Sequence, residues 1–175
     1  RYRMRILVVG GGSIGQRHIQ NLQRLGFDDI LVCDLKSDVL AKIEQRYHIK
    51  KTYTNLLDPL EKNVDAVLVC TPNVSHVPIA RIALENNCHV FVEKPISHNL
   101  EGVDEIIQEA IRRKLVLMVG FNMRFHPNLQ KIKEILDERR IGNVIGALVE
   151  FGYFLPNWHP YEDYRRSYSA QKHLG

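Results

Sequence analysis

Short apolar runs alternate with segments of helical period along the first 120 residues of the chain. The runs predicted to form strands lie at 4–9, 30–33, 51–53, 65–70, 89–92 and 116–119. Most are nearly continuous in apolar residues, which is typical of parallel strands buried on both faces. Between them, apolar residues recur every three or four positions, as at Ile19, Leu22 and Leu25, which predicts helices. This alternation predicts the α/β class, with a doubly wound parallel sheet of strand order 3-2-1-4-5-6.

The pattern changes after Pro127. A helix is predicted at 128–139, followed by one long strand at 144–154 and a polar tail. A single strand and a polar tail cannot bury a hydrophobic core of their own. We therefore predict a complete first domain at residues 1–122, and at 123–175 a linking helix with the truncated start of a second α/β domain. The isolated strand is expected to pair with another chain or to be disordered.

The bulk composition argues against several classes of protein. Hydrophobic residues make up 45% and charged residues 25% of the chain, as in ordinary soluble domains. No apolar run approaches the roughly 20 residues that span a bilayer, and the run after the basic N-terminus is too short for a signal peptide. A cytoplasmic protein without a membrane partner is the default expectation. The densest basic clusters fall in the last turns of predicted helices, so no nucleic-acid partner is expected from the net charge of +4.

The three cysteines, Cys33, Cys70 and Cys88, do not show the spacing of metal ligands. Cys33 and Cys70 fall at the ends of apolar runs. We expect all three to be small buried residues in a reducing compartment, and we expect no metal site.

A glycine-rich turn joins the first predicted strand to the first predicted helix, with the sequence Gly10-Gly11-Gly12-Ser13-Ile14-Gly15. In a dinucleotide-binding loop, Gly10 permits the tight turn, Gly12 lets backbone N–H groups approach a pyrophosphate, and Gly15 allows close helix packing. The second apolar run ends at Asp34, at about the 20-residue distance where an acidic side chain binds the adenosine ribose hydroxyls. This context predicts a Rossmann domain that binds a nicotinamide dinucleotide.

The charge of Asp34 bears on which dinucleotide is bound. A carboxylate at this position repels a 2′-phosphate, which favours NAD. Lys36 and Arg17 could offset that repulsion, so NADP stays open as an alternative.

Three polar, proline-containing clusters come directly after the fourth, fifth and sixth predicted strands. They are Thr71-Pro72-Asn73-Val74-Ser75-His76, Glu93-Lys94-Pro95 and the segment 120–127, which contains Arg124. The carboxyl ends of parallel strands face one edge of the sheet, so these clusters are expected to line one crevice. Partial burial and a charged cofactor can tune the protonation of a lysine there, so Lys94 suits proton transfer to or from a hydroxyl.

Together these motifs resemble the glucose–fructose oxidoreductase/inositol dehydrogenase/MocA (Gfo/Idh/MocA) family of NAD(P)-dependent oxidoreductases. The resemblance implies that Lys94 is catalytic, that Glu93 lies near the nicotinamide ribose, and that the 71–76 loop approaches the cofactor. The candidate cofactor-binding residues are Gly10, Gly12, Ser13, Ile14, Gly15, Asp34, Thr71, Pro72, Asn73, His76, Glu93 and Lys94. The resemblance also implies hydride transfer between nicotinamide and a hydroxyl-bearing carbon of a sugar, sugar derivative or cyclitol.

Some features of the resemblance are incomplete in this chain. The family's second catalytic signature, an Asp followed by a His, is expected after a glycine-rich turn that begins near Gly175. The chain is therefore expected to bind a dinucleotide without completing turnover, and a full-length parent is expected to be a homo-oligomer. Arg124 is a candidate substrate contact, with a salt-bridge role as the alternative. A cis peptide is expected at Lys94–Pro95, because such bonds belong to X–Pro positions in tight turns.

Two other classes of function compete with an oxidoreductase. A non-catalytic dinucleotide sensor can share the fold, but it does not need a base at Lys94. A methyltransferase also uses a glycine loop and an acid after the second strand. The cluster Glu93-Lys94-Pro95 and the parallel sixth strand argue against the methyltransferase.

Overall fold

The computed structural model of the chain describes residues 4–158, 163–166 and 170–172. Gly175, near which the second catalytic signature is expected to begin, lies outside these residues. The chain forms two compact units: the first extends to Gly120 and the second begins at Phe121. None of the helices in the described ranges is both long enough and apolar enough to cross a lipid bilayer.

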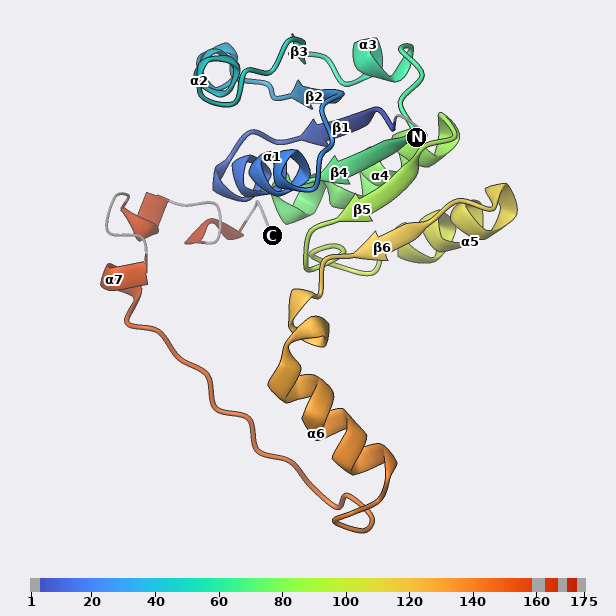
Figure 1. Ribbon diagram of the computed structural model, residues 1–175, viewed down its shortest axis with the longest axis vertical. Coiled ribbons are helices and arrows are strands. Elements are labelled where there is room, and N and C mark those ends of the chain that lie inside the picture. Colours follow the sequence, from blue (N-terminus) through green and yellow to red (C-terminus); the bar gives the residue numbers. More distant parts are fainter. Residues whose placement is uncertain (1–3, 159–162, 167–169, 173–175) are drawn as a thin grey trace. The chain divides into compact units, whose positions relative to one another are not determined.

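The first unit is built on a six-stranded sheet in which all neighbouring strands are parallel (Figure 1). Its strands are β1 Ile6–Val9, β2 Ile30–Cys33, β3 Thr52–Tyr53, β4 Ala66–Val69, β5 His89–Val92 and β6 Leu117–Val119. The order β3-β2-β1-β4-β5-β6 confirms the order predicted from the sequence. At the centre, Val8 of β1 pairs with Val32 of β2 and with Leu68 of β4. The strand order reverses between β1 and β4, and such a switch point is where open α/β sheets bind their ligands.

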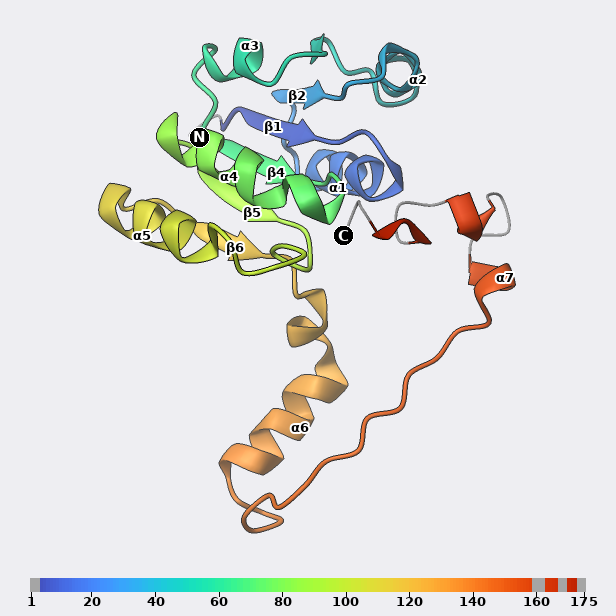
Figure 2. The same ribbon diagram turned by 180° about the vertical axis from the view of Figure 1, so that it is seen from behind.

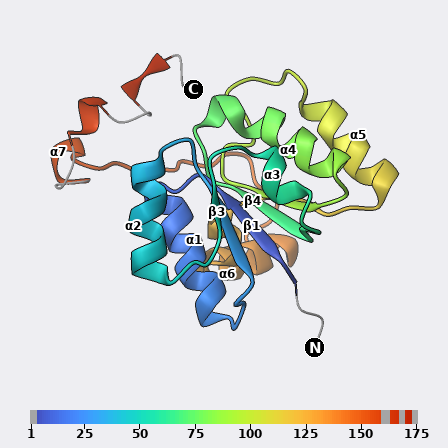
Figure 3. The ribbon, with the colours of Figure 1, turned by 90° about the horizontal axis from the view of Figure 1, so that it is seen from above.

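Helices cover both faces of this sheet, as Figure 3 shows from above. The helices of the first unit are α1 Ser13–Arg24, α2 Ser37–Tyr47, α3 Leu57–Leu60, α4 His76–Glu85 and α5 Val103–Arg113. Leu7 belongs to the core that contains residues of α4 and α5, whereas its neighbour Val8 belongs to the core with residues of α1 and α2. Both side chains are fully buried. Successive residues of a strand point to opposite faces, so a sheet covered on both sides requires apolar residues at consecutive positions.

The regular secondary structure of the second unit is helical within the described residues. It contains α6 Pro127–Asp137 and α7 Leu155–Trp158, with short 3-10 helices at Asn122–Phe125 and Tyr164–Arg166. α6 begins one residue before the predicted start, because the ring of Pro127 has the backbone angle of a first helical residue. His126 caps this helix by accepting a hydrogen bond from the Asn128 N–H at 3.3 Å.

The prediction of a strand at 144–154 is wrong. These residues form a stretched coil between α6 and α7 and belong to no sheet (Figure 2). A strand is stabilised by a neighbour that pairs its N–H and C=O groups. No such neighbour lies among the described residues. The apolar side chains that suggested the strand are exposed, and Ile145, Leu148 and Val149 are each at least 86% exposed.

Candidate functional site

The glycine turn begins where β1 ends, and the tight contacts of its first and last glycines both involve Gly10. Gly10 has a φ of +98°, and a Cβ there would lie 2.6 Å from the carbonyl oxygen of Cys70. A Cβ on Gly15 would lie 1.9 Å from the carbonyl oxygen of Gly10. Both positions therefore exclude any side chain, as the sequence predicted. The close approach brings α1 directly against the end of β1.

Gly12 differs from these two glycines because the space around its Cα is open. No atom lies within 4 Å of the Cβ position, and the backbone has a φ of −67° that any residue adopts. Gly12 is the N-cap of α1, and no side chain caps the helix there. The N–H groups at the start of a helix attract anions. The fold thus leaves room for an anion at this helix end without requiring glycine for its own stability.

Gly11 has no assigned role in the predicted dinucleotide-binding loop, but the structure shows one. A Cβ on Gly11 would lie 2.7 Å from side-chain carbons of Val39 and Ile43 in α2. The Gly11 N–H also donates a hydrogen bond to Asp34 Oδ2 at 2.7 Å. The signal was present in the sequence as a third consecutive glycine, but its cause is a neighbour more than 25 residues away.

Asp34 lies at the end of β2 and is half-buried. Besides the bond from Gly11, its other oxygen, Oδ1, accepts a hydrogen bond from the Lys36 N–H at 2.9 Å. The carboxylate therefore fixes the glycine turn as well as carrying a negative charge beside it. A carboxylate accepts about four hydrogen bonds, so further donors, such as sugar hydroxyls, can still bind.

The loop after β4 packs against the glycine turn. The Cβ position of Gly10 is 3.0 Å from the backbone nitrogen of Thr71. Within the loop, the Ser75 hydroxyl lies 2.8 Å from Thr71 Oγ1 and from the carbonyl oxygen of Pro72, and Thr71, Pro72 and Asn73 are partly exposed. These contacts place the start of the loop at the switch point of the sheet.

His76 is the buried member of this loop, with 1% of its surface exposed. Its Nδ1 lies 2.8 Å from the carbonyl oxygen of Pro95, and its Nε2 lies 2.8 Å from that of Thr71. Both partners are acceptors, so a neutral ring donates to one of them and only the protonated ring donates to both. The side chain joins two loops from inside the unit, whereas the sequence led us to expect a contact with cofactor or substrate.

Glu93 and Lys94 follow β5 and differ in exposure. The side chain of Glu93 is 15% exposed, whereas Lys94 is exposed. Glu93 Oε1 accepts a hydrogen bond from His18 Nε2 at 2.7 Å, and Glu93 Oε2 accepts one from the Lys94 N–H at 3.2 Å. The Lys94–Pro95 peptide bond is cis, as predicted. His18 is a further residue of the site that the sequence analysis did not identify.

Opposing influences act on the pKa of the Glu93 carboxyl. Burial raises it, but the hydrogen bonds from His18 and from the Lys94 N–H, with the positive charges of both residues, hold the pKa below its usual 4.5. Glu93 is therefore ionised at neutral pH, and its charge is held between α1 and the exposed lysine.

Most of the predicted site residues come together in the first unit, at the carboxyl ends of β1, β2, β4 and β5. The contacts described above join the glycine turn to Asp34 and to the 71–76 loop, and they join α1 and that loop to Glu93 and Pro95. Ser13 is exposed at the start of α1, and Ile14 packs against the core beneath it. Arg124 belongs to the second unit, where it is exposed.

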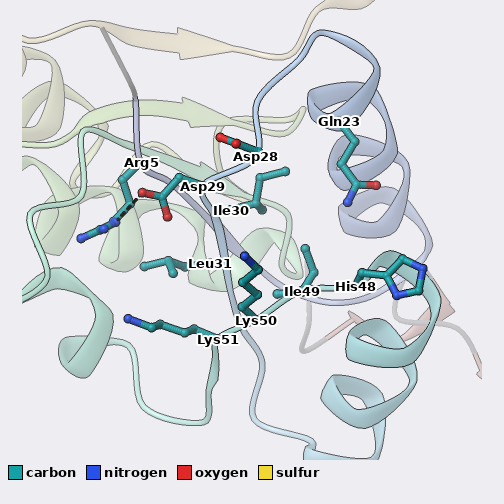
Figure 4. Close-up of a pocket in the computed structure, with 10 residues that line it drawn as sticks. All are labelled: Arg5, Gln23, Asp28, Asp29, Ile30, Leu31, His48, Ile49, Lys50 and Lys51. Carbon is teal, nitrogen blue, oxygen red and sulfur yellow. Dashed lines mark hydrogen bonds and ion pairs between the residues drawn. The ribbon is translucent and has the colours of Figure 1, made fainter.

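A pocket of about 280 Å³ lies on the other side of the first unit, at the amino ends of the strands (Figure 4). It is lined by Arg5, Gln23, Asp28, Asp29, Ile30, Leu31, His48, Ile49, Lys50 and Lys51. These residues surround the amino ends of β1 and β2, and Arg5 forms an ion pair with Asp29 at 3.1 Å. Ligands of open α/β sheets bind beyond the carboxyl ends, so this pocket is not the candidate site.

The cysteines and metal-binding groups offer no additional chemistry in the described part of the chain. Cys33, Cys70 and Cys88 are buried free thiols, as predicted. Burial raises the pKa of Cys33 and of Cys88 to about 11, and it raises the pKa of Cys70 further. Thiols of this kind are unreactive. The described residues contain no group of three or more His, Cys, Asp or Glu side chains that could hold a metal ion.

Comparison with known families identifies the first unit. Residues 4–121 match the oxidoreductase family with an NAD-binding Rossmann fold that bears the name Gfo/Idh/MocA. The chain belongs to the Gfo/Idh/MocA family. The resemblance inferred from the motifs is therefore confirmed. Among curated members, myo-inositol 2-dehydrogenase of Thermotoga maritima is 38% identical over 142 residues, which make up 79% of this chain and 42% of that protein.

Solved structures of Gfo/Idh/MocA relatives share the fold of this chain. A probable dehydrogenase from Thermotoga maritima is 36% identical with a TM-score of 0.73, and the match covers 79% of this chain and 42% of that one. The WlbA dehydrogenase from Bordetella pertussis, solved in complex with NADH and UDP-GlcNAcA, is 26% identical with a TM-score of 0.74. That match covers 81% of this chain and 44% of WlbA. The chain thus spans about two-fifths of the length of these relatives.

Proposed function

We propose that this chain binds NAD and supplies the cofactor half of an oxidoreductase that acts on a hydroxyl of a cyclitol, a sugar or a sugar derivative. The observation that carries the proposal is the uncapped start of α1 at Gly12, with an open space beside it and the Asp34 carboxylate tied to the same turn. Family membership supports the reaction class, because curated members include inositol dehydrogenases. The WlbA structure, with its NADH and UDP-GlcNAcA, supports both the cofactor and a sugar-like substrate.

The residues of the first unit fit a dinucleotide in extended form. Backbone N–H groups at Gly12, Ser13 and Ile14 would bind the pyrophosphate at the start of α1. Asp34 would accept hydrogen bonds from the adenosine ribose. The loop that contains Thr71, Pro72 and Asn73 would line the path towards the nicotinamide, with Glu93 at the nicotinamide ribose. His76 would support this path from inside the unit, through its bonds to two carbonyl groups.

Lys94 is proposed as the acid–base residue of the reaction. When bound, the nicotinamide ring would accept a hydride from the hydroxyl-bearing carbon of the substrate or return one to it. Lys94 would take the hydroxyl proton as the carbonyl forms, or donate it in the reverse direction. The side chain is exposed at the carboxyl edge of the sheet, where a substrate can reach it. Arg124, which is also exposed, is proposed to contact the substrate.

This assignment gives the two predicted domains different functions. We propose that residues 1–122 form the dinucleotide-binding domain and that 123–175 begin the domain for substrate binding and assembly into a homo-oligomer. The exposed apolar residues at 144–154 support this proposal, because a segment of this kind lacks a strand partner in the described residues. A small cyclitol-like or sugar-like molecule is the expected substrate.

Direct titration of the 175-residue chain tests the proposed function. NADH, NADPH and S-adenosylmethionine would each be titrated while nicotinamide fluorescence or heat of binding is measured. We expect saturable binding of NADH, weaker binding of NADPH and no binding of S-adenosylmethionine. Saturable binding of S-adenosylmethionine alone, or of none of the three, would contradict the proposal.

Asp34→Asn is expected to lower the preference for NADH over NADPH. The amide oxygen can still accept the Gly11 N–H, which keeps the bond to the glycine turn. The bond from the Lys36 N–H is lost, and so is the charge that repels a 2′-phosphate. Removing one charge at contact distance should change the ratio of the two dissociation constants by about tenfold or more. Asp38→Asn, on the exposed start of α2, serves as the control and should leave the ratio unchanged. An unchanged ratio in Asp34→Asn would count against the ribose assignment.

A further inference from the structure

A histidine on α1 is bonded to the loop that carries the exposed lysine. His18 lies one helical turn after Gly15, and its Nε2 donates to Glu93 Oε1 over 2.7 Å. The side chains of His18 and Glu93 are only 19% and 15% exposed. The other oxygen of Glu93 accepts the Lys94 N–H. One carboxylate thus links the helix to the backbone of Lys94.

The surroundings of this pair keep it in one geometry. The His18 ring packs edge-on against Phe91 of β5, with a distance of 5.2 Å between ring centroids. A Cβ on Gly120 would lie 2.8 Å from Phe91 Cζ and 3.4 Å from Glu93 Oε1. The glycine after β6 therefore leaves just enough room for the pair. Residues of α1, of β5 and of the position after β6 therefore all contribute to the packing of this pair.

We propose that His18 is a positioning residue, which fixes Glu93 and the Lys94 backbone relative to the helix whose first turn is the dinucleotide loop. This inference rests on the proposed function. The start of α1 would hold the pyrophosphate, and His18, in the second turn of the same helix, holds the segment that would meet the nicotinamide. A single rigid helix thereby sets the distance between the two ends of the cofactor path.

Three variants separate positioning from simple packing. In His18→Gln the amide nitrogen lies as many bonds from Cα as Nε2 does, so a donor to Glu93 is retained without the ring. His18→Leu keeps an apolar side chain but removes the donor. His18→Asn keeps an amide that is too short to reach Glu93, and it replaces His18→Leu if the leucine variant does not fold. His98→Gln, at an exposed histidine, is the matched control.

The first measurement is the pKa of the Glu93 carboxyl. NMR would monitor its titration in the 175-residue chain, with Glu93→Gln used to assign the resonance. Burial raises the Glu93 pKa and the hydrogen bond from His18 lowers it. The pKa should therefore rise in His18→Leu, which lacks the donor, and return part of the way in His18→Gln. The resonance of the Lys94 N–H should shift in His18→Leu and return towards its original position in His18→Gln. His98→Gln should change neither. A folded His18→Leu variant with both quantities unchanged would overturn the positioning role.

The second measurement compares the binding of NADH with that of ADP, which has the adenosine and the pyrophosphate but neither the nicotinamide ribose nor the nicotinamide ring. We expect His18→Leu to weaken NADH binding by about three- to tenfold relative to ADP binding, the effect of losing about one hydrogen bond at the nicotinamide end. His18→Gln should restore most of the ratio. Equal weakening of both ligands would mean that His18 only maintains α1, and would overturn the inference.

The two proposals fail in different ways. If the unsubstituted chain binds neither NADH nor ADP, the proposed function is wrong. The Glu93 pKa and the Lys94 N–H resonance then still decide whether His18 fixes this segment, because neither measurement uses a ligand.

Discussion

Gly12→Val is expected to abolish NADH binding while leaving the fold intact. The backbone of Gly12 already has angles that valine adopts, and no protein atom lies near its Cβ position. The new side chain would therefore fill the open space at the start of α1, where the pyrophosphate is proposed to bind. We expect the dissociation constant for NADH to rise by at least about 100-fold, equivalent to about 3 kcal/mol of lost phosphate contacts. Nicotinamide fluorescence titration measures this loss.

Two other glycines provide the controls for Gly12. Gly146→Val, in the second unit, also places valine in open space and should change neither stability nor NADH binding. Gly15→Ala should instead unfold the first unit or destabilise it by about 3 kcal/mol or more, because its methyl group would collide with the Gly10 carbonyl. Thermal unfolding separates the two effects. A folded Gly12→Val chain that binds NADH as tightly as the unsubstituted chain would show that the pyrophosphate does not bind at α1.

The sheet could be predicted from the sequence because its signals are local. The run Ile30–Cys33 is apolar at every position, and it forms β2 with those bounds. The polarity of a run does not, however, specify its partner. The run at 144–154 is also rich in apolar residues, yet it forms no strand, because pairing depends on another segment. A local apolar pattern thus predicts a strand correctly when the partner strands belong to the same unit, as they do for β2.

The candidate site shows the same limit at the level of side chains. Gly10 and Gly15 were identified from spacing, because the positive φ of Gly10 is part of the turn itself and a side chain on Gly15 is excluded by the Gly10 carbonyl. The role of His76 could not be predicted, because the orientation of its ring depends on two carbonyl groups, one of which is 19 residues away in the sequence. The bond from His18 to Glu93 spans 75 residues and has no signature in the sequence. Motif spacing therefore locates the loops, whereas the residues that fix them emerge only from packing.

Lys94→Ala is expected to have the largest effect on the reaction. In a protein that carries this chain and oxidises a cyclitol or sugar, kcat should fall by about 10²- to 10⁴-fold, the usual contribution of a positioned acid–base group. NADH affinity should change little, since the proposed phosphate and ribose contacts at Gly12 and Asp34 are made by other loops. The exposed position of Lys94 makes the substitution tolerable for the fold. Steady-state kinetics and NADH titration measure the two quantities separately.

Two further lysine variants sharpen this test. Lys94→Arg keeps a positive charge but does not release its proton at neutral pH, so it should be nearly as inactive as Lys94→Ala if proton transfer is the role of the residue. Lys42→Ala removes an exposed lysine from α2 and should leave turnover unchanged. Normal activity in Lys94→Arg would mean that Lys94 contributes charge alone. Normal activity in Lys94→Ala would remove this lysine from the reaction altogether, because a group that transfers the hydroxyl proton cannot be deleted without slowing that step.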